Sequence, residues 1–320
     1  MRKIRALAPA KVNLTFDIIG SLPDGYHQVE TLMQSVDLQD DISLTVEDSD
    51  RFAVSITCTN EIVPKNFPLD DSNLMVKAAR RFFEKAALAD RYKISVEIEK
   101  SIPIGAGLAG GSADAAAMLV GLNHLFGKPL NQASLLELAA SLGADIPFCI
   151  EGGTSIGTAR GDKLQPLKQT LSLFYCIVKP KTLSIATAWA YGRYDAYQDT
   201  IARPNLQAAV KAMQTDDLQT AVKSFGNVFE PVIFAEHPDL QPIKQQMLKI
   251  GCWCCHLSGS GPALYALVAD REQAHAIRKK MLKTDDLEFD YVRLSMPDLG
   301  PPLEFYIAQS TAGGVTLLSS

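Results

Sequence analysis

The sequence predicts an α+β fold, in which strands and helices are mixed without regular alternation. Several segments alternate apolar and polar residues, as half-buried strands do. Other segments repeat apolar residues at helical spacing and end at glycine. Because strict strand–helix–strand repetition is missing, these observations favour α+β over a doubly wound parallel sheet.

The first half of the chain opens with a clear strand pattern. In KVNLTFDII (11–19), one face is apolar, while Lys11 and Asn13 lie on the other face. Asp71 or Ser72 is expected to cap the first helix. The remaining elements expected here are strands at 40–48, 52–58 and 92–102, and helices at 73–88, 112–126 and 134–143.

A second unit follows the turn-rich segment 151–167. The elements expected in it are strands at 172–180 and 289–295, a turn and strand at 255–269, and helices at 205–225, 239–250 and 271–281. The last segment is rich in proline, glycine, serine and threonine, so we expect a partly mobile tail. The chain is therefore divided into an N-terminal domain (1–160), a C-terminal domain (161–298) and a tail (299–320).

Composition narrows the class of partner. The 320 residues carry a net charge of −5, which argues against nucleic acid or an anionic membrane as the main partner. We find no apolar run of membrane-spanning length and no secretory signal. The six cysteines are too few and too irregular for a disulfide framework, so we expect reduced thiols and a cytoplasmic protein.

A glycine-rich turn lies between a predicted strand and a predicted helix. In IPIGAGLAGGSADAAAML (102–119), four glycines and Ser112 precede an alanine-rich run. Glycine lets the backbone approach a ligand closely, and the first turn of a helix offers unpaired N–H groups. Together these features predict an anion site, most often for phosphate.

Three other interpretations of this turn differ in the residues that they require. A Rossmann loop needs an acidic residue about 20 positions further on, and none stands near 130. A Walker A loop needs a lysine before Ser112, and Gly111 stands there instead. A turn that only packs a helix on a strand stays open as an alternative.

Several polar residues are candidates for chemistry. Lys11 stands among small apolar residues, and a partly enclosed ammonium group suits the charge that develops in phosphoryl transfer. Asp145, in LGADIPFCI, is a candidate general base, although an N-cap role is compatible with the Pro147 that follows. Tyr26 and His27 follow a Pro-Asp-Gly turn, where His27 is either a core histidine or a recognition group for a polar heterocycle.

Two further segments need an interpretation. LSGSGPA (257–263) is a second glycine-serine loop, which makes a purely structural turn less expected for both loops. GCWCCH (251–256) invites a metal interpretation, but zinc sites need paired elements separated by a loop. We therefore favour a buried strand of small apolar residues over a metal site.

Three of these motifs together resemble a known family. PIGAGLAGGSADAAA resembles the signature of the GHMP kinases, which are named for galactokinase, homoserine, mevalonate and phosphomevalonate kinases. APAKVNLTFDI and LSGSGPALYAL resemble the first and third motifs of that family, in the same order. Within it, DGYHQVETLMQSVDLQDDI, LGADIPFCIEGG and FGNVFEPVIF resemble the members that act on a cytidine diphosphate derivative of methylerythritol.

The resemblance implies both a fold and a reaction. The fold has an N-terminal domain like ribosomal protein S5 domain 2 and a ferredoxin-like C-terminal domain, with the active site in the cleft between them. In the reaction, ATP phosphorylates the 2-hydroxyl of the methylerythritol moiety, in the non-mevalonate route to isoprenoid precursors. Mg²⁺ is the expected partner of ATP, and the protein is a monomer or a homodimer.

The resemblance also implies roles for individual residues. Lys11 and Asp145 match the catalytic pair, and Asn13 would position the substrate. Tyr26 and His27 match cytidine-binding positions, and Thr187 and Tyr191 match further substrate-binding positions. The residues that match the ATP-phosphate loop are Pro103, Ile104, Gly105, Ala106, Gly107, Leu108, Ala109, Gly110, Gly111, Ser112 and Ala113.

The chain departs from the family pattern at three places. Ala109 stands where glycine is commoner, and we expect this small change to fit. Asp114 stands where other members have asparagine, and adds a negative charge near the phosphates that a metal would balance. GNVFE (226–230) stands where NDLE is commoner. The metal ligands are not identified by the sequence, and Ser112 and Asp114 are the candidates.

Overall fold

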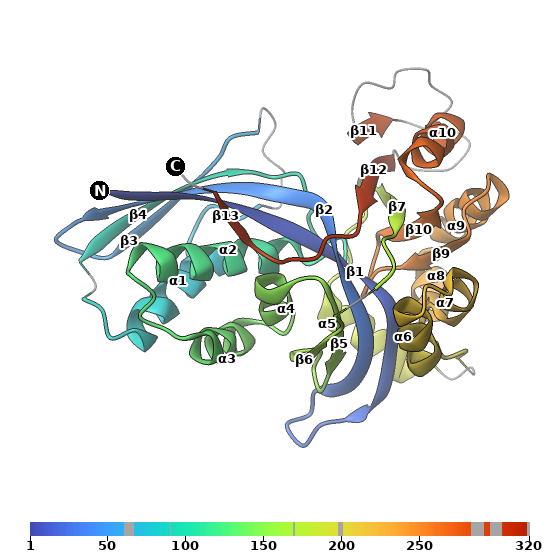
Figure 1. Cartoon of the computed structure of the whole chain (residues 1–320), viewed down its shortest axis with the longest axis horizontal. Coiled ribbons are helices and arrows are strands. Elements are labelled where there is room, and N and C mark those ends of the chain that lie inside the picture. The colour runs from blue at the N-terminus through green and yellow to red at the C-terminus, as the bar shows by residue number, and fades with distance from the viewer. Residues whose placement is uncertain are drawn as a thin grey trace.

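The chain folds around two β-sheets (Figure 1). The computed structural model describes residues 1–60, 67–89, 91–168, 170–197, 201–282, 291–294 and 303–318. The helices and strands are mixed without strict alternation, so the predicted α+β class is confirmed.

The first sheet has eight strands, whose central order is β13-β1-β2-β4-β3, with β5, β6 and β8 paired off this path. Its strands are β1 (Arg2–Ser21), β2 (His27–Asp48), β3 (Ala53–Cys58), β4 (Tyr92–Glu99), β5 (Thr154–Thr158), β6 (Lys163–Pro166), β8 (Gly226–Asn227) and β13 (Thr316–Leu318). The helices on one face of it are α1 (Leu74–Lys85), α2 (Gly110–Leu125), α3 (Gln132–Leu142) and α4 (Ile146–Glu151) (Figure 1).

The second sheet has five strands in the order β11-β12-β7-β10-β9. Its strands are β7 (Phe174–Pro180), β9 (Cys254–Leu257), β10 (Leu264–Val268), β11 (Tyr291–Leu294) and β12 (Leu303–Gln309). The helices of this half are α5 (Thr187–Ala196), α6 (Leu206–Gln214), α7 (Leu218–Ser224), α8 (Glu230–Glu236), α9 (Leu240–Lys249) and α10 (Arg271–Leu282). Of the strand expected at 289–295, the described residues are 291–294, which form β11.

Strands β1 and β2 are much longer than the sequence predicts. They pair antiparallel from Arg2 opposite Val46 to Ser21 opposite His27. The register shifts three times along β1, and the segment that carries Lys11 lies between two of these irregularities. Such bulges bend a strand and re-aim its side chains, and they interrupt the local alternation from which strand length is predicted.

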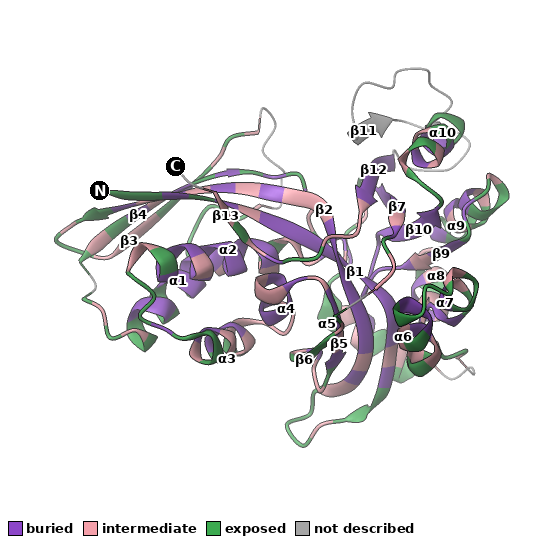
Figure 2. Ribbon diagram, viewed as in Figure 1, coloured by how far each residue is buried: buried purple, intermediate pink, exposed green. Residues whose placement is uncertain are grey.

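Helix α2 packs against β1 and β2 at the centre of the first half. Its alanines are almost fully buried, because their small side chains allow the helix to approach the sheet closely. A Cβ atom at Gly121 would lie 2.5 Å from Leu44 Cδ1, so a larger residue there would require the buried Leu44 side chain to shift. Figure 2 shows buried residues running along β1, β2 and α2, which places the start of α2 on a rigid base.

The cap of α1 differs from the expectation. Asn73, rather than Asp71 or Ser72, precedes the helix, and its Oδ1 accepts a hydrogen bond of 2.9 Å from the amide of Met75. Ser72 instead donates to Asp70 in the preceding turn. Asn, Asp and Ser are about equally suited to capping, so the path of the backbone determines which of these residues caps the helix.

The C-terminal segment is a structural part of both sheets, so the expected tail is wrong for residues 303–318. Strand β12 lies between β11 and β7, with Phe305 and Ala308 fully buried, and β13 pairs with β1 at the edge of the first sheet. The expectation rested on the composition of the whole segment, which hid the short apolar run LEFYIAQ (303–309). The β5–β6 hairpin (154–166) also crosses the boundary placed at residue 160.

We predict that the two C-terminal strands contribute very unequally to stability. A chain ending after residue 302 lacks β13 and also β12, an interior strand of the second sheet, so we expect loss of cooperative folding in circular dichroism melts. A chain ending after residue 315 lacks only three edge pairs of β13, and we expect it to lose about 1–2 kcal/mol of unfolding free energy. Equal losses for both truncations would contradict the placement of β12.

Candidate active site

A cleft of about 1090 Å³ lies between the two halves. Its lining includes the catalytic candidates Lys11 and Asp145 and nine of the loop residues matched to ATP binding. Tyr26, His27, Thr187 and Tyr191 also line the cleft, although they lie far apart in the sequence. Three predicted site residues do not line it and are buried beside it: Asn13, Leu108 and Ala113.

The two glycine loops are packed against each other. A Cβ atom at Gly107 would lie 2.1 Å from the carbonyl oxygen of Ser258, so no side chain fits there. Ser258 Oγ donates to the carbonyl of Gly107 at 3.0 Å, and the amide of Ala263 donates to the carbonyl of Ala106 at 3.0 Å. The second loop therefore holds the first in its shape.

The first loop leaves backbone open at the start of α2. Gly105 and Gly107 have φ of 60° and 81°, which is the left-handed region that glycine tolerates. Gly111 is exposed, and a Cβ atom there would meet nothing within 4 Å. The first turn of an α-helix has amides without intrahelical partners, and in α2 the residues of that turn line the cleft, as a phosphate site requires.

Lys11 and Asp145 meet in the cleft. Lys11 is 4% exposed, and its Nζ lies 3.6 Å from Asp145 Oδ1. Asp145 stands directly before α4, at the N-cap position, but its side chain makes no capping hydrogen bond. The Asp145 carboxylate is therefore not used in capping α4 and is available to the cleft.

Asn13 makes side-chain hydrogen bonds that the sequence does not predict. Its Oδ1 accepts from Lys11 Nζ at 2.6 Å, and its Nδ2 donates to Thr31 Oγ1 at 2.8 Å. Thr31 in turn donates to the carbonyl of Thr15 at 2.6 Å. Both ends of the amide are thus engaged in orienting the ammonium group of Lys11, and direct contact between Asn13 and a substrate stays a prediction.

His27 and Tyr191 come together on one wall of the cleft. Their rings stack with centroids 4.5 Å apart and planes at 22°, and His27 Nε2 lies 2.7 Å from Asp195 Oδ1. The ring of Phe229 packs edge-on against Tyr191 at 5.1 Å. Burial raises the pKa of Tyr191, and the nearby charge of Asp145 raises it further, so its hydroxyl stays neutral.

Tyr26 forms the outer part of this wall and is largely exposed. The guanidinium of Arg160 lies 5.4 Å from the centre of the Tyr26 ring and is anchored by Asp162 at 2.8 Å. Arg160 lines the cleft, although its segment of the sequence has only the pattern of a turn and gives no sign of a binding residue. Deeper in the cleft, Thr187 Oγ1 lies 3.2 Å from Ser260 Oγ of the second loop.

A buried cluster of three charged residues lies beneath the first loop. Lys100 Nζ donates to Asp40 at 2.5 Å and to Asp114 at 2.8 Å, and all three side chains are nearly inaccessible. Asp40 also accepts from the amides of Ser101 and Ile102, at the entrance to the loop. Lys100 is one positive charge against two carboxylates, so it offsets only part of the negative charge that Asp114 adds here.

The ionisation of this cluster follows from burial and mutual charge. Burial raises the pKa of Asp40, and the nearby Asp114 raises it further, while Lys100 opposes both effects. Burial would lower the pKa of Lys100, but the two carboxylates outweigh it and raise that pKa. The network holds the strand end at residue 100 and the first turn of α2 together, and so supports the loop between them.

The segment GNVFE supports the second loop. Asn227 Nδ2 donates to the carbonyls of Leu257 and Gly259 at 2.9 and 2.7 Å. Glu230 accepts from the amide of Leu257 and pairs with Lys244. Burial would raise the pKa of Glu230, but His256 and Lys244 outweigh it and lower that pKa. Asn227 and Glu230 therefore position the second loop, and neither residue lines the cleft.

The cysteine-rich segment packs as apolar core. Cys254 and Cys255 lie in β9 and are buried, and burial raises the pKa of both thiols, which disfavours the thiolate that a metal would need. Within the described residues, no group of three or more His, Cys, Asp or Glu side chains is placed to hold a metal ion. None of the helices in the described part of the chain has the length and hydrophobicity for a membrane crossing.

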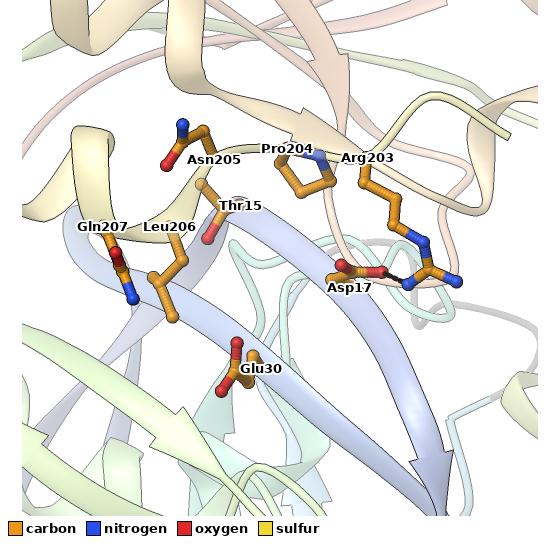
Figure 3. A pocket seen from close by; sticks show the side chains of 8 residues that line it. All are labelled: Thr15, Asp17, Glu30, Arg203, Pro204, Asn205, Leu206 and Gln207. Carbon is orange, nitrogen blue, oxygen red and sulfur yellow. Dashed lines mark hydrogen bonds and ion pairs between the residues drawn. The ribbon is translucent and has the colours of Figure 1, made fainter.

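A smaller pocket of about 260 Å³ lies on the other face of β1 (Figure 3). Phe16 lines the main cleft, whereas its neighbours Thr15 and Asp17 point the opposite way into this pocket, as alternate strand residues do. Asp17 is paired there with Arg203 at 2.6 Å. The pocket contains none of the residues predicted to act in catalysis or binding.

The arrangement of glycine loop, lysine and aspartate defines a small-molecule kinase of the GHMP type, and the chain belongs to the GHMP kinase family. The family profile for the "GHMP kinases N terminal domain" matches residues 73–153, and that for "GHMP kinases C terminal" matches residues 205–286. Kinases of this family use ATP as the phosphate donor.

Individual relatives carry a more specific name than the family. The chain is 36% identical over 324 residues to a 4-diphosphocytidyl-2-C-methyl-D-erythritol kinase of Acaryochloris marina, with 98% of each chain covered. It is 38% identical to the kinase of the same name from Bacillus cytotoxicus, over 86% of this chain and 91% of the relative.

Solved structures agree with this family. A 4-(cytidine 5'-diphospho)-2C-methyl-D-erythritol kinase matches with a TM-score of 0.70 and 25% identity, over 97% of this chain and 99% of that chain. A homoserine kinase from Cytophaga hutchinsonii matches with a TM-score of 0.72 and 22% identity, over 99% and 98% of the two chains, and shows the shared fold. The resemblance read from the three sequence motifs is thus confirmed.

We predict that Ala109 carries conformational strain. It precedes α2 with φ of 59°, where an L side chain costs about 1–2 kcal/mol. Part of this is offset because glycine loses more backbone entropy on folding, so Ala109→Gly should raise the unfolding free energy by about 0.5–1 kcal/mol in urea titrations.

Two control variants test the physical reason. Ala87 has φ of 52° outside the cleft, so Ala87→Gly should also stabilise the protein. Ala115 lies within α2 and is fully buried, so Ala115→Gly should destabilise it by about 1 kcal/mol or more. A loss of stability in Ala109→Gly would show that the left-handed backbone is not strained.

Proposed function

We propose that this protein transfers the γ-phosphoryl group of ATP to the 2-hydroxyl of 4-diphosphocytidyl-2-C-methyl-D-erythritol, in the non-mevalonate route to isoprenoid precursors. The observation that carries the proposal is the meeting of the glycine loop, the Lys11–Asp145 pair and the His27–Tyr191 wall in one cleft. The name of relatives that match over almost the whole chain supports the choice of substrate.

The ATP phosphates would lie along the loop 103–113. The amides at the start of α2 donate to phosphate oxygens, and the positive end of the helix favours their charge. Leu108 and Ala113 are buried, so any contact they make with phosphate is through the backbone. The loop needs no Walker lysine, because its backbone and the helix end supply the electrostatic stabilisation.

Asp145 and Lys11 would act on the hydroxyl that attacks. The hydroxyl proton passes to the Asp145 carboxylate, the substrate oxygen forms a bond to the γ-phosphorus, and the bond to the β-phosphate oxygen breaks to release ADP. The Lys11 ammonium lies between the carboxylate and Asn13, so it would stabilise the negative charge on the transferred group.

The residues at the start of α2 fit Mg²⁺, which prefers oxygen ligands and retains water and phosphate oxygens in its coordination shell. Ser112 lines the cleft, and Asp114 Oδ1 is buried with no hydrogen-bond partner among the described residues. These two side chains would hold the ion. When bound, Mg²⁺ supplies neutralisation of the phosphate charge.

The wall of aromatic residues would recognise the cytidine end of the substrate. Tyr26 and His27 would contact the base, and Thr187 and Tyr191 would contact the substrate further into the cleft. His27 covers one face of the Tyr191 ring. A base that stacks on this wall would therefore use the part of the wall that the His27–Tyr191 contact leaves uncovered. Arg160, beside Tyr26, adds a cation suited to the diphosphate.

Two other functions compete with this proposal. Another acceptor, such as homoserine or mevalonate, is compatible with the fold, since kinases for both share it. The higher identity to the cytidyl kinases favours their substrate. A silent nucleotide-binding module would have no need for a buried lysine held 3.6 Å from a carboxylate, so the Lys11–Asp145 pair favours an active enzyme.

The proposal also covers the compartment, the partners and the oligomeric state of the protein. All six cysteines are free thiols, which suits a reducing compartment such as the cytoplasm. The net charge of −5 disfavours nucleic acid and anionic membranes as partners. The protein would act as a monomer or a homodimer on its small-molecule substrate.

The deciding experiment is a coupled ADP-release assay with ATP and Mg²⁺. The acceptors are 4-diphosphocytidyl-2-C-methyl-D-erythritol, homoserine and mevalonate, each at the same concentration. Turnover with the cytidyl substrate alone is expected. Turnover with another alcohol would keep the kinase and overturn the substrate, and no turnover by folded, ATP-binding protein would favour the silent module.

We predict that Asp145→Asn separates catalysis from binding. The amide keeps the shape of the side chain but cannot take the proton, so kcat should fall about 10²–10⁴-fold while KM for ATP and acceptor changes little. Asp217→Asn, at the cap of α7 and outside the cleft, is the matched control and should retain full activity. Unchanged kcat in Asp145→Asn would remove the base assignment.

We also predict that His27→Ala acts on one substrate only. Loss of the imidazole removes a polar contact to the cytidine end, so KM for the cytidyl substrate should rise at least about tenfold while KM for ATP stays nearly constant. Steady-state kinetics with each substrate varied in turn measure both values. A change confined to KM for ATP would contradict the proposed recognition of the base.

A further inference from the structure

We propose that Asp195 determines which ring nitrogen of His27 carries the proton, and thereby selects a base with an amino group at its edge over one with a carbonyl. This inference rests on the proposed function, because it names the group that discriminates among substrate bases. Asp195 acts through His27, so it is a positioning residue for specificity.

The geometry leaves one arrangement for the proton. His27 Nε2 lies 2.7 Å from Asp195 Oδ1, and an ionised carboxylate only accepts hydrogen bonds. Nε2 must therefore carry the proton and donate it to Asp195. In the neutral imidazole, the other ring nitrogen, Nδ1, is then an acceptor.

Helix α5 holds the ring in place on two sides. Tyr191 and Asp195 are four residues apart in this helix, so their side chains share one face. Tyr191 stacks on the plane of the imidazole at 4.5 Å, while Asp195 holds its Nε2 edge. The ring cannot turn over without losing the contact with Asp195, so the position of Nδ1 is determined as well.

Nδ1 is the available group of His27. In the part of the chain that the structure describes, the hydrogen bond of His27 is the one through Nε2, and no partner is seen at Nδ1. His27 lines the cleft next to Tyr26. An acceptor on this ring is thus available to a base that lies against this wall of the cleft.

An acceptor at this position discriminates between pyrimidines. Cytosine carries an amino group at C4, which donates, whereas uracil carries a carbonyl there, which accepts. Uracil would need a proton on Nδ1, and moving it there breaks the hydrogen bond between Nε2 and the Asp195 carboxylate. A site that leaves a buried polar group unpaired rejects the wrong substrate strongly.

The test compares the cytidine substrate with its uridine counterpart at about pH 8, where histidine side chains are commonly neutral. The measured quantity is the ratio of kcat/KM for the two substrates. Asp195→Ala should lower this ratio about tenfold, mainly because the uridine substrate improves relative to the cytidine one. Asp195→Glu supplies a carboxylate again and should restore part of the ratio.

A control on the same helix separates specificity from stability. Arg193 pairs with Glu236 and does not line the cleft, so Arg193→Ala should leave the ratio unchanged. An unchanged ratio in Asp195→Ala, with both KM values raised equally, would show that Asp195 only stabilises the helix, and would overturn the proposal.

A second measurement does not depend on activity. The ¹⁵N chemical shifts of His27 report its tautomer directly, and we expect the Nε2–H form in the unmodified protein and a mixture in Asp195→Ala. The Nδ1–H form in the unmodified protein would overturn the proposal. Lack of turnover with both nucleotide substrates would instead overturn the proposed function, while the tautomer would still test Asp195.

Discussion

The active site depends on the contact between two backbone loops that are far apart in the sequence. The carbonyl of Ser258 lies where a Cβ atom of Gly107 would be, so the loops meet at a distance that only glycine permits. This contact brings the glycine-rich turn of the first half against the second half. The same turn contacts the strand that carries Lys11, because the amide of Lys11 donates to the carbonyl of Leu108. A side chain at residue 107 would separate these elements.

Two buried lysines support the site in different ways. Lys100 is enclosed with the carboxylates of Asp40 and Asp114 and donates hydrogen bonds to both, so it stabilises the loop. Lys11 is equally buried, but its carboxylate partner is 39% exposed in the side chain and faces the cleft. A buried charge is costly unless it is paired, and the two lysines differ in whether their carboxylate partners are buried or open to the cleft.

Helix α5 links the chemistry to the choice of substrate. Its residues reach the second loop through Thr187 and the outer wall through Tyr191 and Asp195. A helix holds side chains at fixed spacing, so in the proposed function one element would place several of the groups that contact a long substrate. The fold alone does not make this choice, since a homoserine kinase shares it with a TM-score of 0.72.

The sequence by itself determined the local features of this protein: the glycine turn before α2, the strand that carries Lys11, and the three motifs of the family. These depend on residues that are near each other in the chain, where periodicity and turn chemistry are legible. Only the tertiary structure decided that Asp40, Lys100 and Asp114 form one cluster, that Asn13 orients Lys11, and that residues 303–309 complete the second sheet. Such pairings join distant residues, and neither composition nor local pattern specifies which distant partner a strand or a charge will meet.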